Sequence, residues 1–521
     1  MSQHDIAPPP DRFNFARHLI GMNAGRADRP ALIDDAGTLS YGQLGEQVQR
    51  CSAALSALGL RREDRVLLLM HDSSDWVVSF LGALHAGVVP VCVNTLLTAT
   101  DYAYMLADSR AQAVLVSGAL LPAIRSAMDS TPNEVRHVVV SRGQELPAGA
   151  HDWAAWVGAQ APGQGADTHA DEPAFWLYSS GSTGSPKGTV HTQANLYWTA
   201  ELYGRGVLGL RETDVVFSAA KLFFAYGLGN ALSFPLSVGA SVVLMAERPT
   251  PPAVFKRLVE HRPTVFCGAP TGYGGMLASP DLPTRDQVAL RLCSSAGEAL
   301  PRDIGERWTA RFGCEIIDGI GSTEMLHIFL SNRPGDVRYG TTGKAVPGYE
   351  VQLRDEDGSV ITGHDQIGDL YIQGPSAALM YWNNRAKSRD TFQGAWTRSG
   401  DKYSRDADGY YTYAGRNDDM LKVSGIYVSP FEVEATLVQH PAVLEAAVIG
   451  KTDDDGLTKT KAFVVLRPGQ ATTEPELQAF VKDRLAPYKY PRFVEFVPEL
   501  PKTATGKIQR FRLREMENRA P

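Results

Sequence analysis

Short apolar segments alternate with helical patterns through roughly the first 300 residues, and this alternation restricts the fold more than any other feature of the chain. The segment 64–70, "DRVLLLM", predicts a buried strand, and 75–87 predicts a helix that ends at a glycine. The segment 88–94 predicts the next strand, and 113–117 predicts a third strand after a helix near 98–107. Strands that alternate with helices in this way indicate a parallel sheet covered by helices.

The same order of elements returns about 150 residues further along the chain. Strands are predicted at 214–220, 241–246 and 264–270, with a helix near 252–261 before the last of them. This repeat predicts two similarly wound βαβ lobes with a ligand cleft between them. Because βαβ units are common, a chance likeness between the two stretches remains an open alternative.

The pattern of predicted strands and helices changes in the last third of the sequence. Strand segments separated by turn signals such as "EDG" predict a smaller β-rich subdomain from about residue 340. Beyond "RNDD", a helix begun at Ser429 and Pro430 opens a pattern of strands and helices that predicts a small α+β domain. The predicted fold is α/β, with a large N-terminal domain, 1–417, that contains the two lobes and the β-rich subdomain, and a small C-terminal domain, 418–521.

Charge, cysteine content and hydropathy exclude several classes of protein. The net charge of −7 disfavours nucleic acid or an anionic membrane surface as the main partner. The sequence contains no run of 18 or more apolar residues, so we expect no membrane span. The N-terminal stretch lacks an apolar signal core. The five cysteines are odd in number and lack CxxC spacing, which favours reduced thiols. We therefore expect a cytoplasmic enzyme for small molecules, as a monomer or homodimer.

The stretch 179–188, "SSGSTGSPKG", is expected as a loop between the strand "AFWLYSS" and the helix "VHTQANLYWTAEL". Glycine lets backbone N–H groups approach an anion, hydroxyls add donors and Lys187 adds a positive charge, so the stretch predicts a phosphate-binding loop. It is not a Walker A loop, because Pro186 precedes the lysine and Gly188 follows it. Taken alone, such a stretch is also typical of a flexible linker.

Four further motifs follow this loop, at 318–324 ("DGIGSTE"), 396–401 ("WTRSGD"), 415–425 ("GRNDDMLKVSG") and 501–507 ("PKTATGK"). In content and order the five motifs resemble those of the adenylate-forming superfamily, which includes acyl- and aryl-CoA ligases, luciferases and peptide-synthetase adenylation domains. The resemblance covers nearly the whole chain. Within that superfamily, the segments "FFAYG", "SAGEALP" and "DGIGSTEMLHIF" are most similar to the benzoate-CoA ligases.

The resemblance implies an ATP-dependent aryl-CoA ligase that uses ATP, Mg²⁺ and coenzyme A. A carboxylate, most simply benzoate, would attack the α-phosphate of ATP, and the CoA thiol would then displace AMP. A benzoic acid with a pKa of roughly 4 is already ionised at neutral pH, so the reaction needs positioned charges rather than a general base. The alternatives are a ligase for a substituted benzoate or cinnamate, a P-loop phosphotransferase, which the failed Walker pattern disfavours, and a non-catalytic nucleotide-binding protein.

The same resemblance assigns roles at the nucleotide. Thr323 would contact the α-phosphate, Glu324 would ligate Mg²⁺, and Asp401 would accept the ribose hydroxyls. The other implied ATP or AMP contacts are Ser180, Gly181, Thr183, Gly184, Lys187, Glu298, Asp318, Gly319, Ile320 and Arg416. Relatives often carry an aromatic residue where this chain has Ile320, so adenine stacking would be aliphatic or come from elsewhere. Taken alone, Glu324 is also typical of a surface helix start and Asp401 of a turn.

Lys507 is the implied catalytic residue for adenylation, since its ammonium can bridge the carboxylate oxygen and the α-phosphate. It must leave before the thiol enters, so the resemblance implies a mobile C-terminal domain that rotates about a hinge at Asp418 between the half-reactions. Lys422, Ser424 and Gly425 would then lie along the path of CoA. Outside such a motif, a lysine in a polar loop is typical of solvated surface.

An aryl slot is implied for the carboxylate. Phe224 stands where peptide-synthetase domains carry an aspartate for the substrate amine, which argues against an amino-acid substrate. The implied lining residues are Phe224, Ala225, Tyr226, Gly227, Ala296, Gly297, Gly321, Leu326, His327 and Ile328. His327 is the polar member, although a histidine is commonly structural. A long tunnel for a fatty acyl chain is not excluded.

Overall fold

The computed structural model describes residues 6–181, 184–416, 419–423, 426–452, 458–485, 489–502 and 508–519. The chain divides into two compact units. The first contains Met1–Val351 and Ile372–Thr397, and the second contains Gln352–Tyr371 and Arg398–Pro521. Strands of the predicted β-rich subdomain thus belong largely to the second unit, and the domain boundary expected at 417/418 stays a prediction.

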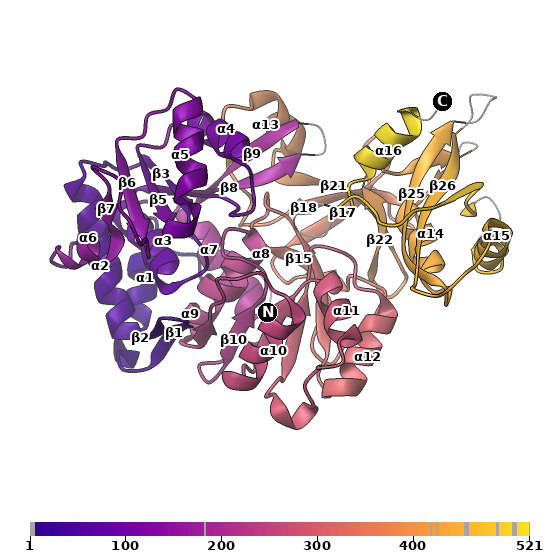
Figure 1. The fold of residues 1–521 in the computed structure, drawn as a ribbon, viewed down its shortest axis with the longest axis horizontal. Helices are drawn as coiled ribbons and strands as arrows, with labels where there is room; N and C mark the ends of the chain where they lie inside the picture. The colour runs from indigo at the N-terminus through magenta and orange to yellow at the C-terminus, as the bar shows by residue number, and fades with distance from the viewer. Residues whose placement is uncertain are drawn as a thin grey trace. The chain divides into compact units, whose positions relative to one another are not determined.

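Two mainly parallel sheets form the first unit (Figure 1). One sheet has the order β19-β9-β8-β4-β3-β5-β6-β7, and the other has the order β16-β15-β14-β13-β12-β10-β11-β1-β2. The strands of the former are β3 (Arg65–Leu69), β4 (Val89–Cys92), β5 (Ala113–Ser117), β6 (His137–Ser141), β7 (His151–Asp152), β8 (Pro173–Gly181), β9 (Gly184–Thr192) and β19 (Met380–Tyr381). Those of the latter are β1 (Pro30–Asp34), β2 (Gly37–Ser40), β10 (Val215–Ser218), β11 (Ser241–Val243), β12 (Val265–Gly268), β13 (Leu292–Ser295), β14 (Ile316–Gly321), β15 (Ile328–Ser331) and β16 (Lys344–Ala345).

The two sheets repeat one winding order. In one, β3 lies between β4 and β5, and in the other β10 lies between β11 and β12; all four pairings are parallel. Parallel neighbours need a crossover connection, and the helical patterns of the sequence supply it. The strands predicted at 64–70, 88–94 and 113–117 therefore correspond in order to those predicted at 214–220, 241–246 and 264–270. The prediction of two similarly wound lobes is confirmed.

Three apolar cores separate the layers of the first unit. Along β3, Val66 and Leu68 enter one core while Leu67 and Leu69 enter another, because successive side chains of a strand point to opposite faces. The core between the two sheets also takes side chains of α1 (Phe15–Met22), α2 (Tyr41–Ala57), α3 (Ser74–Ala86), α6 (Trp153–Gly158) and α7 (Gln193–Thr199). The outer cores lie under α4 (Ala99–Ser109) and α5 (Leu121–Ser130), and under α10 (Pro251–Glu260), α11 (Pro270–Ala278) and α12 (Arg302–Phe312). The result is a helix–sheet–helix–sheet–helix arrangement.

The phosphate-loop motif lies in a β-hairpin, which differs from the sequence prediction. Strands β8 and β9 pair antiparallel, with Gly181 opposite Gly184 and Ser179 opposite Lys187. The helix expected from residue 190 begins only at Gln193, as α7. The prediction of a strand–loop–helix motif was therefore wrong: the chain after the loop first runs back along β8, so no helix N-terminus follows the loop directly.

The second unit is an α+β structure. Strand β25 (Val443–Thr452) pairs antiparallel with β26 (Thr458–Leu466), and β27 (Phe493–Phe496) adds to β26 in parallel. One apolar core lies between this sheet and α14 (Pro430–Leu437) and α15 (Glu474–Lys482), and another includes Leu513 of α16 (Arg510–Arg519). The further strands that lie in this unit or cross its boundary are β17 (Glu350–Arg354), β18 (Gly368–Gln373), β21 (Trp396–Arg405), β22 (Tyr411–Arg416), β23 (Leu421–Val423) and β24 (Ile426–Val428).

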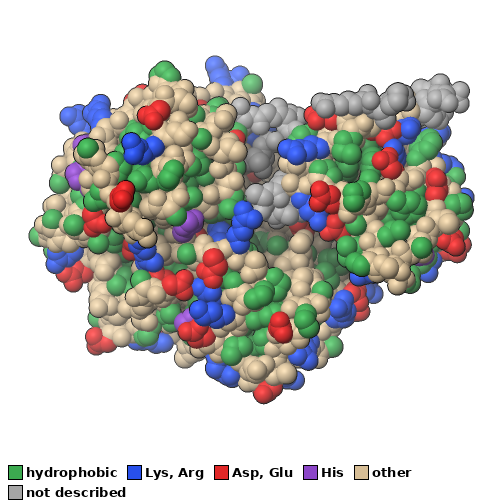
Figure 2. All heavy atoms as spheres, in the orientation of Figure 1, with side chains coloured by type: hydrophobic (Ala, Val, Ile, Leu, Met, Phe, Trp, Pro, Cys, Tyr) green, Lys and Arg blue, Asp and Glu red, His purple; other side chains and the backbone are tan. Residues whose placement is uncertain are grey.

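The surface mixes charges of both signs. Figure 2 shows acidic and basic side chains interspersed with apolar ones over the visible face. Within the described ranges, no helix combines the length and the apolar character that crossing a membrane requires.

Candidate active site

An aromatic cluster lies in the first unit around His327, where the sequence predicts the aryl pocket. The imidazole stacks on Tyr226, with ring centroids 5.5 Å apart, and its edge meets Phe234 at 4.4 Å and Tyr203 at 5.2 Å. The Tyr226 hydroxyl donates to Ser294 Oγ at 2.9 Å. Two predicted pocket residues, Tyr226 and His327, thus come together from segments 101 residues apart.

The imidazole of His327 is neutral, and one of its two ring nitrogens has no hydrogen-bond partner among the described residues. Burial lowers the pKa of His327 to about 3, and Nε2 lies 3.3 Å from the Tyr226 carbonyl, to which it donates. Nδ1 is therefore the unprotonated nitrogen, and it has no hydrogen-bond partner among the described residues. A buried acceptor without a partner is uncommon, so this atom is a natural contact for a polar group on a ligand.

Glycines give the pocket its close packing. A Cβ at Gly227 would lie 2.0 Å from the Lys221 carbonyl oxygen, and a Cβ at Gly229 would lie 2.4 Å from His327 Cδ2 and 2.6 Å from Phe234 Cζ. Both positions exclude any side chain. Gly227 lies in α8 (Ala225–Leu228), and Gly229 opens the π-helix η5 (Gly229–Ser233).

The turn that carries Thr323 and Glu324 is held by its backbone carbonyls. The Thr323 carbonyl accepts from His191 Nε2 at 2.8 Å, and the Glu324 carbonyl accepts from the Ala378 N–H at 2.8 Å. The next carbonyl, that of Met325, accepts from Ser376 Oγ at 2.8 Å. The turn is thereby fixed from two sides, by the end of β9 and by the segment before β19.

The protonation of His191 follows from its neighbours. Burial lowers the pKa of His191 to about 4, and Asn195 Nδ2 donates to its Nδ1 at 2.8 Å. The same amide nitrogen donates to the carbonyls of Ser376 and Ala377, which settles the orientation of the amide. The imidazole is therefore neutral with its proton on Nε2, as the contact to Thr323 requires.

Lys187 and Glu324 meet at one tyrosine. The Tyr381 hydroxyl donates to Glu324 Oε1 at 2.7 Å, and Lys187 Nζ lies 4.9 Å from the centroid of the Tyr381 ring. The sequence motifs predicted both charged residues but not the tyrosine between them. The signal for Tyr381 is weak, because it stands 57 residues from Glu324 and outside every motif.

Two neighbouring parallel strands, β13 and β14, carry residues predicted for the aryl slot and for the nucleotide. Ala296, Gly297 and Glu298 follow β13, and Asp318 lies on β14 opposite Ser295. Asp318 is buried, Oδ1 has no hydrogen-bond partner in the described part of the chain, and burial raises the pKa of this carboxyl well above its ordinary value. The remaining predicted residues in this region are Gly319, Ile320 and Gly321 of β14, Leu326 of the turn, and Ile328, which begins β15.

The remaining pocket residues precede or begin α8. Phe224 is the N-cap residue of α8 and is followed by Ala225, and both are partly buried against the core between the sheets. Glu298, a predicted nucleotide contact that follows β13, accepts a hydrogen bond from Thr271 Oγ1 at 2.7 Å.

Two predicted nucleotide contacts are paired with each other in the second unit. Asp401 of β21 lies opposite Arg416 of β22, and Arg416 Nη1 donates to Asp401 Oδ1 at 3.2 Å. The Asp401 side chain is 9% exposed and that of Arg416 is 46% exposed, so the carboxylate is held while the guanidinium reaches solvent.

Several predicted residues lie outside the described residues. These are Thr183, Asp418, Ser424, Gly425 and Lys507, together with the side chains of Ser180 and Lys422. The backbones of Gly181 and Gly184 are described as part of the hairpin.

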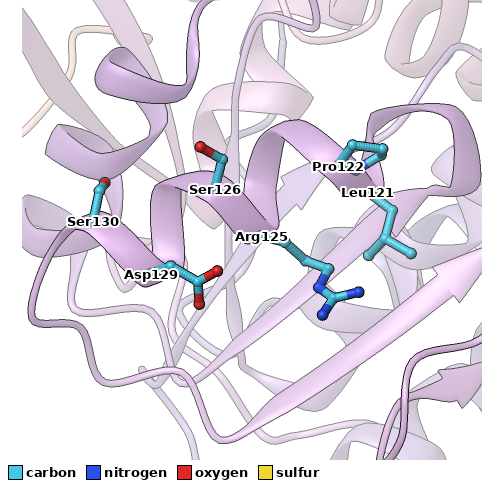
Figure 3. Close-up of a pocket in the computed structure, with 6 residues that line it drawn as sticks. All are labelled: Leu121, Pro122, Arg125, Ser126, Asp129 and Ser130. Carbon is cyan, nitrogen blue, oxygen red and sulfur yellow. The ribbon is translucent and has the colours of Figure 1, made fainter.

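An open depression on the surface involves none of the predicted residues. It runs along α5 and is lined by Leu121, Pro122, Arg125, Ser126, Asp129 and Ser130 (Figure 3). All six side chains come from one surface helix, so the depression does not bring distant segments together as the aromatic cluster does.

Comparisons with known proteins identify the family to which the chain belongs. The family model described as "AMP-binding enzyme" matches residues 22–382, and the model "AMP-binding enzyme C-terminal domain" matches residues 432–507. The chain therefore belongs to the AMP-binding enzyme family, and the resemblance inferred from its five motifs is confirmed.

Within that family, several aryl-CoA ligases are similar to the chain over nearly its whole length. The chain is 58% identical over 525 residues to a benzoate–CoA ligase of Thauera aromatica, with 99% of each protein covered. It is 47% identical over 517 residues to a 4-hydroxybenzoate–CoA/benzoate–CoA ligase of Rhodopseudomonas palustris, covering 97% of this chain and 94% of that protein. A crystal structure of a benzoate CoA ligase from Burkholderia xenovorans superposes with a TM-score of 0.89 and 61% identity, covering 96% of this chain and 100% of that chain.

Proposed function

We propose that this protein is an AMP-forming benzoate-CoA ligase, which converts benzoate, ATP and CoA into benzoyl-CoA, AMP and diphosphate through a benzoyl-adenylate. Its small-molecule partners are then an aryl carboxylate, ATP and CoA. The near full-length similarity to the benzoate–CoA ligase of Thauera aromatica supports the choice of acid.

One observation carries the proposal. A single turn carries Glu324, which contacts Tyr381 as the phosphate-loop residue Lys187 also does, and three residues later carries His327, which lies in an aromatic cluster. A carboxylate and an ammonium suit a metal-bound polyphosphate, and an apolar slot suits a benzene ring. On this proposal the same turn would lie next to both substrates, ATP and benzoate.

The chain contributes position and charge rather than a general base. Benzoate is ionised at neutral pH, and its ring would lie against Tyr226 and His327 with its carboxylate toward Thr323. Lys187 and the loop around Ser180, Gly181, Thr183 and Gly184 would hold the leaving diphosphate, and Lys507 would stabilise the charge that develops at the α-phosphate. Asp401 and Arg416 would contact the ribose and phosphate of AMP.

Glu324 fits the ligand chemistry of Mg²⁺. It offers carboxylate oxygens, which this hard cation prefers, and Tyr381 orients the group through Oε1. When bound with ATP, Mg²⁺ would supply charge neutralisation at the phosphates.

The first experiment is a panel of acids in carboxylate-dependent ATP–diphosphate exchange and in CoA thioester formation. We expect benzoate to give the highest kcat/KM, with acetate and long fatty acids at least 100-fold lower, because roughly 1–3 kcal/mol is lost for each poorly filled part of an apolar pocket. No exchange with any aryl acid would refute the ligase function. It would favour a non-catalytic nucleotide-binding protein.

A second experiment separates the two half-reactions. In Lys507→Ala, we expect adenylation to fall by at least 100-fold, since a positioned charge at the transition state is removed, while supplied benzoyl-adenylate is still converted to benzoyl-CoA. Equal loss of both half-reactions would contradict the role given to Lys507.

A hydroxylated benzoate is a second candidate substrate, favoured by the unpartnered Nδ1 of His327. A ring hydroxyl could donate to that nitrogen, and the relative from Rhodopseudomonas palustris is named for 4-hydroxybenzoate as well as benzoate. The acid panel decides between them, because a kcat/KM for 4-hydroxybenzoate above that for benzoate would make it the preferred substrate.

The domain division and the cellular setting are part of the same proposal. We retain a hinge at Asp418 between 1–417 and 418–521, with Lys422, Ser424 and Gly425 near CoA after rotation. The separate family match of 432–507 supports a distinct C-terminal domain. A cytoplasmic monomer or homodimer is the expected form.

A further inference from the structure

Tyr381 contacts two residues that the proposed function assigns to the nucleotide. It is buried, with 3% of its surface exposed, at the end of β19. Its hydroxyl donates to Glu324 Oε1 at 2.7 Å, and its ring faces Lys187 Nζ at 4.9 Å from the centroid. A neutral side chain thus lies between a carboxylate and an ammonium.

The sheet register brings Lys187 to this ring. Strand β19 pairs antiparallel with β9, and Tyr381 lies opposite Thr189. Lys187 and Thr189 are two residues apart on β9, so their side chains share one face. Lys187 is therefore the diagonal cross-strand neighbour of Tyr381, a separation that a long side chain spans.

Contacts on its other sides fix the tyrosine. Its backbone N–H donates to Ser388 Oγ at 3.0 Å, and its ring packs against Phe392 with centroids 5.4 Å apart. Just upstream on the same segment, the Ala378 N–H holds the Glu324 carbonyl at 2.8 Å. Because both the backbone and the side chain of Glu324 are held from this one segment, Tyr381 has the rigidity needed to orient the carboxylate.

The two contacts act on charges of opposite sign. A hydroxyl that donates to a carboxylate forms a charge-assisted hydrogen bond, which fixes Oε1 and thereby the direction of Oε2. The face of an aromatic ring attracts an ammonium without neutralising it. Both charges are then held in place before ATP arrives, which lowers the ordering cost of binding.

We propose that Tyr381 is a positioning residue of the nucleotide site, which orients Glu324 toward Mg²⁺ through its hydroxyl and holds the Lys187 ammonium toward the phosphates through its ring. This inference rests on the nucleotide roles proposed for Glu324 and Lys187.

The test measures ATP binding by titration calorimetry without any carboxylic acid, once with Mg²⁺ and once with EDTA. The ratio of the two Kd values is the magnesium gain. Tyr381→Phe keeps the ring and loses the hydroxyl, so we expect an unchanged Kd in EDTA and a magnesium gain reduced about tenfold. Tyr381→Leu also loses the ring, so its Kd in EDTA should rise about threefold.

A double-mutant cycle shows whether the hydroxyl acts through Glu324. In a Glu324→Gln background, Tyr381→Phe should leave the magnesium gain unchanged, because the oriented carboxylate is already gone. Tyr197→Phe is the matched control: it loses a hydroxyl that donates to the Ala7 carbonyl at 2.7 Å, and it should bind ATP as the wild type does.

Two results would overturn the inference. The first is a magnesium gain in Tyr381→Phe that equals that of the wild type. The second is that Tyr381→Phe reduces the magnesium gain by the same factor in the Glu324→Gln background as in the wild type. If Tyr381→Leu fails to fold, Tyr381→Phe alone decides. Failure of the proposed function looks different, because the wild type would then show no benzoate-dependent exchange.

Discussion

Asp72 is a buried carboxyl group that holds the backbone just before Phe224, a residue predicted to line the aryl pocket. Its two oxygens lie 3.2 Å and 3.3 Å from the backbone nitrogen of Leu222, two residues before Phe224, and accept from it. Burial raises the pKa of Asp72 to about 6, against the opposing charge of Lys221. The Lys221 ammonium is itself held by the carbonyls of Met245 and Glu247.

This pKa predicts how stability depends on pH. A carboxyl whose pKa is higher in the folded state favours folding most below the unfolded pKa of about 4, and that contribution is lost as pH rises through 6. Asp72→Asn keeps the acceptor for Leu222 but cannot ionise. Between pH 5 and pH 7.5 we therefore expect the variant to gain about 1–2 kcal/mol relative to the wild type, measured by thermal unfolding at both pH values. A constant difference between the two proteins would contradict the raised pKa.

The strands and helices of the lobes could be predicted because their signals are local. The segment 113–117 is an apolar strand in the sequence and is β5 in the structure, and Ser429 caps the helix predicted to start there by accepting from the Glu432 N–H. Residues 190–192 were predicted as helix because the apolar residues that follow have helical spacing. Their strand conformation comes from antiparallel pairing with β8, in which His191 lies opposite Phe175 and Thr192 opposite Pro173, and the helical spacing of the residues that follow gives no signal of that pairing.

The same distinction between local and non-local signals applies to the residues of the candidate site. Glu324, Lys187 and His327 could be named because each lies in a motif or beside one. Tyr381 and Ser294 could not, since their roles arise only when distant strands bring them to Glu324 and Tyr226.

The π-helix η5 is an element whose sequence sets the shape of the pocket. In Gly229→Ala the new methyl group would overlap His327 and Phe234, at 2.4 Å and 2.6 Å, so at least one of the two rings must move. We expect the KM for benzoate to rise at least tenfold while the Kd for ATP in the absence of acid stays within twofold. Steady-state kinetics and calorimetry give the two values.

Gly21→Ala in α1 is the matched control, because nothing lies within 4 Å of its new methyl group. It should leave the KM for benzoate unchanged and alter stability by no more than about 1 kcal/mol. A Gly229→Ala enzyme with an unchanged KM for benzoate would mean that the pocket around His327 does not hold the aryl ring.

At the scale of the whole molecule, each unit has apolar cores of its own, so the units can lose structure separately. A buried ionic network belongs to the second unit. Arg510 donates to both oxygens of Glu434, at 3.1 Å and 2.6 Å, and lies 3.5 Å from Asp419. Glu434 also accepts from the Val448 N–H at 2.7 Å. Asp419 follows the proposed hinge residue, so the network ties the start of the proposed C-terminal domain to α16, the helix that follows the proposed catalytic lysine.

Arg510→Met is predicted to destabilise the second unit by about 3–5 kcal/mol, because it leaves the buried Glu434 without its cation. Scanning calorimetry should then show a new, lower transition while the main transition of the first unit stays in place. Limited proteolysis should cut first within Arg398–Pro521. Adenylation should fall with the population of the intact second unit, because that unit carries Lys507.

Two further variants make this prediction specific. Adding Glu434→Gln to Arg510→Met removes the unpaired charge but keeps an acceptor for Val448, so most of the lost stability should return. Arg307→Met breaks an exposed pair with Asp303, whose side chain is 72% exposed, and should change the free energy of unfolding by less than about 1 kcal/mol. If Arg510→Met instead lowers a single transition for the whole chain, the two units unfold as one. The network would then stabilise the whole molecule rather than the second unit alone.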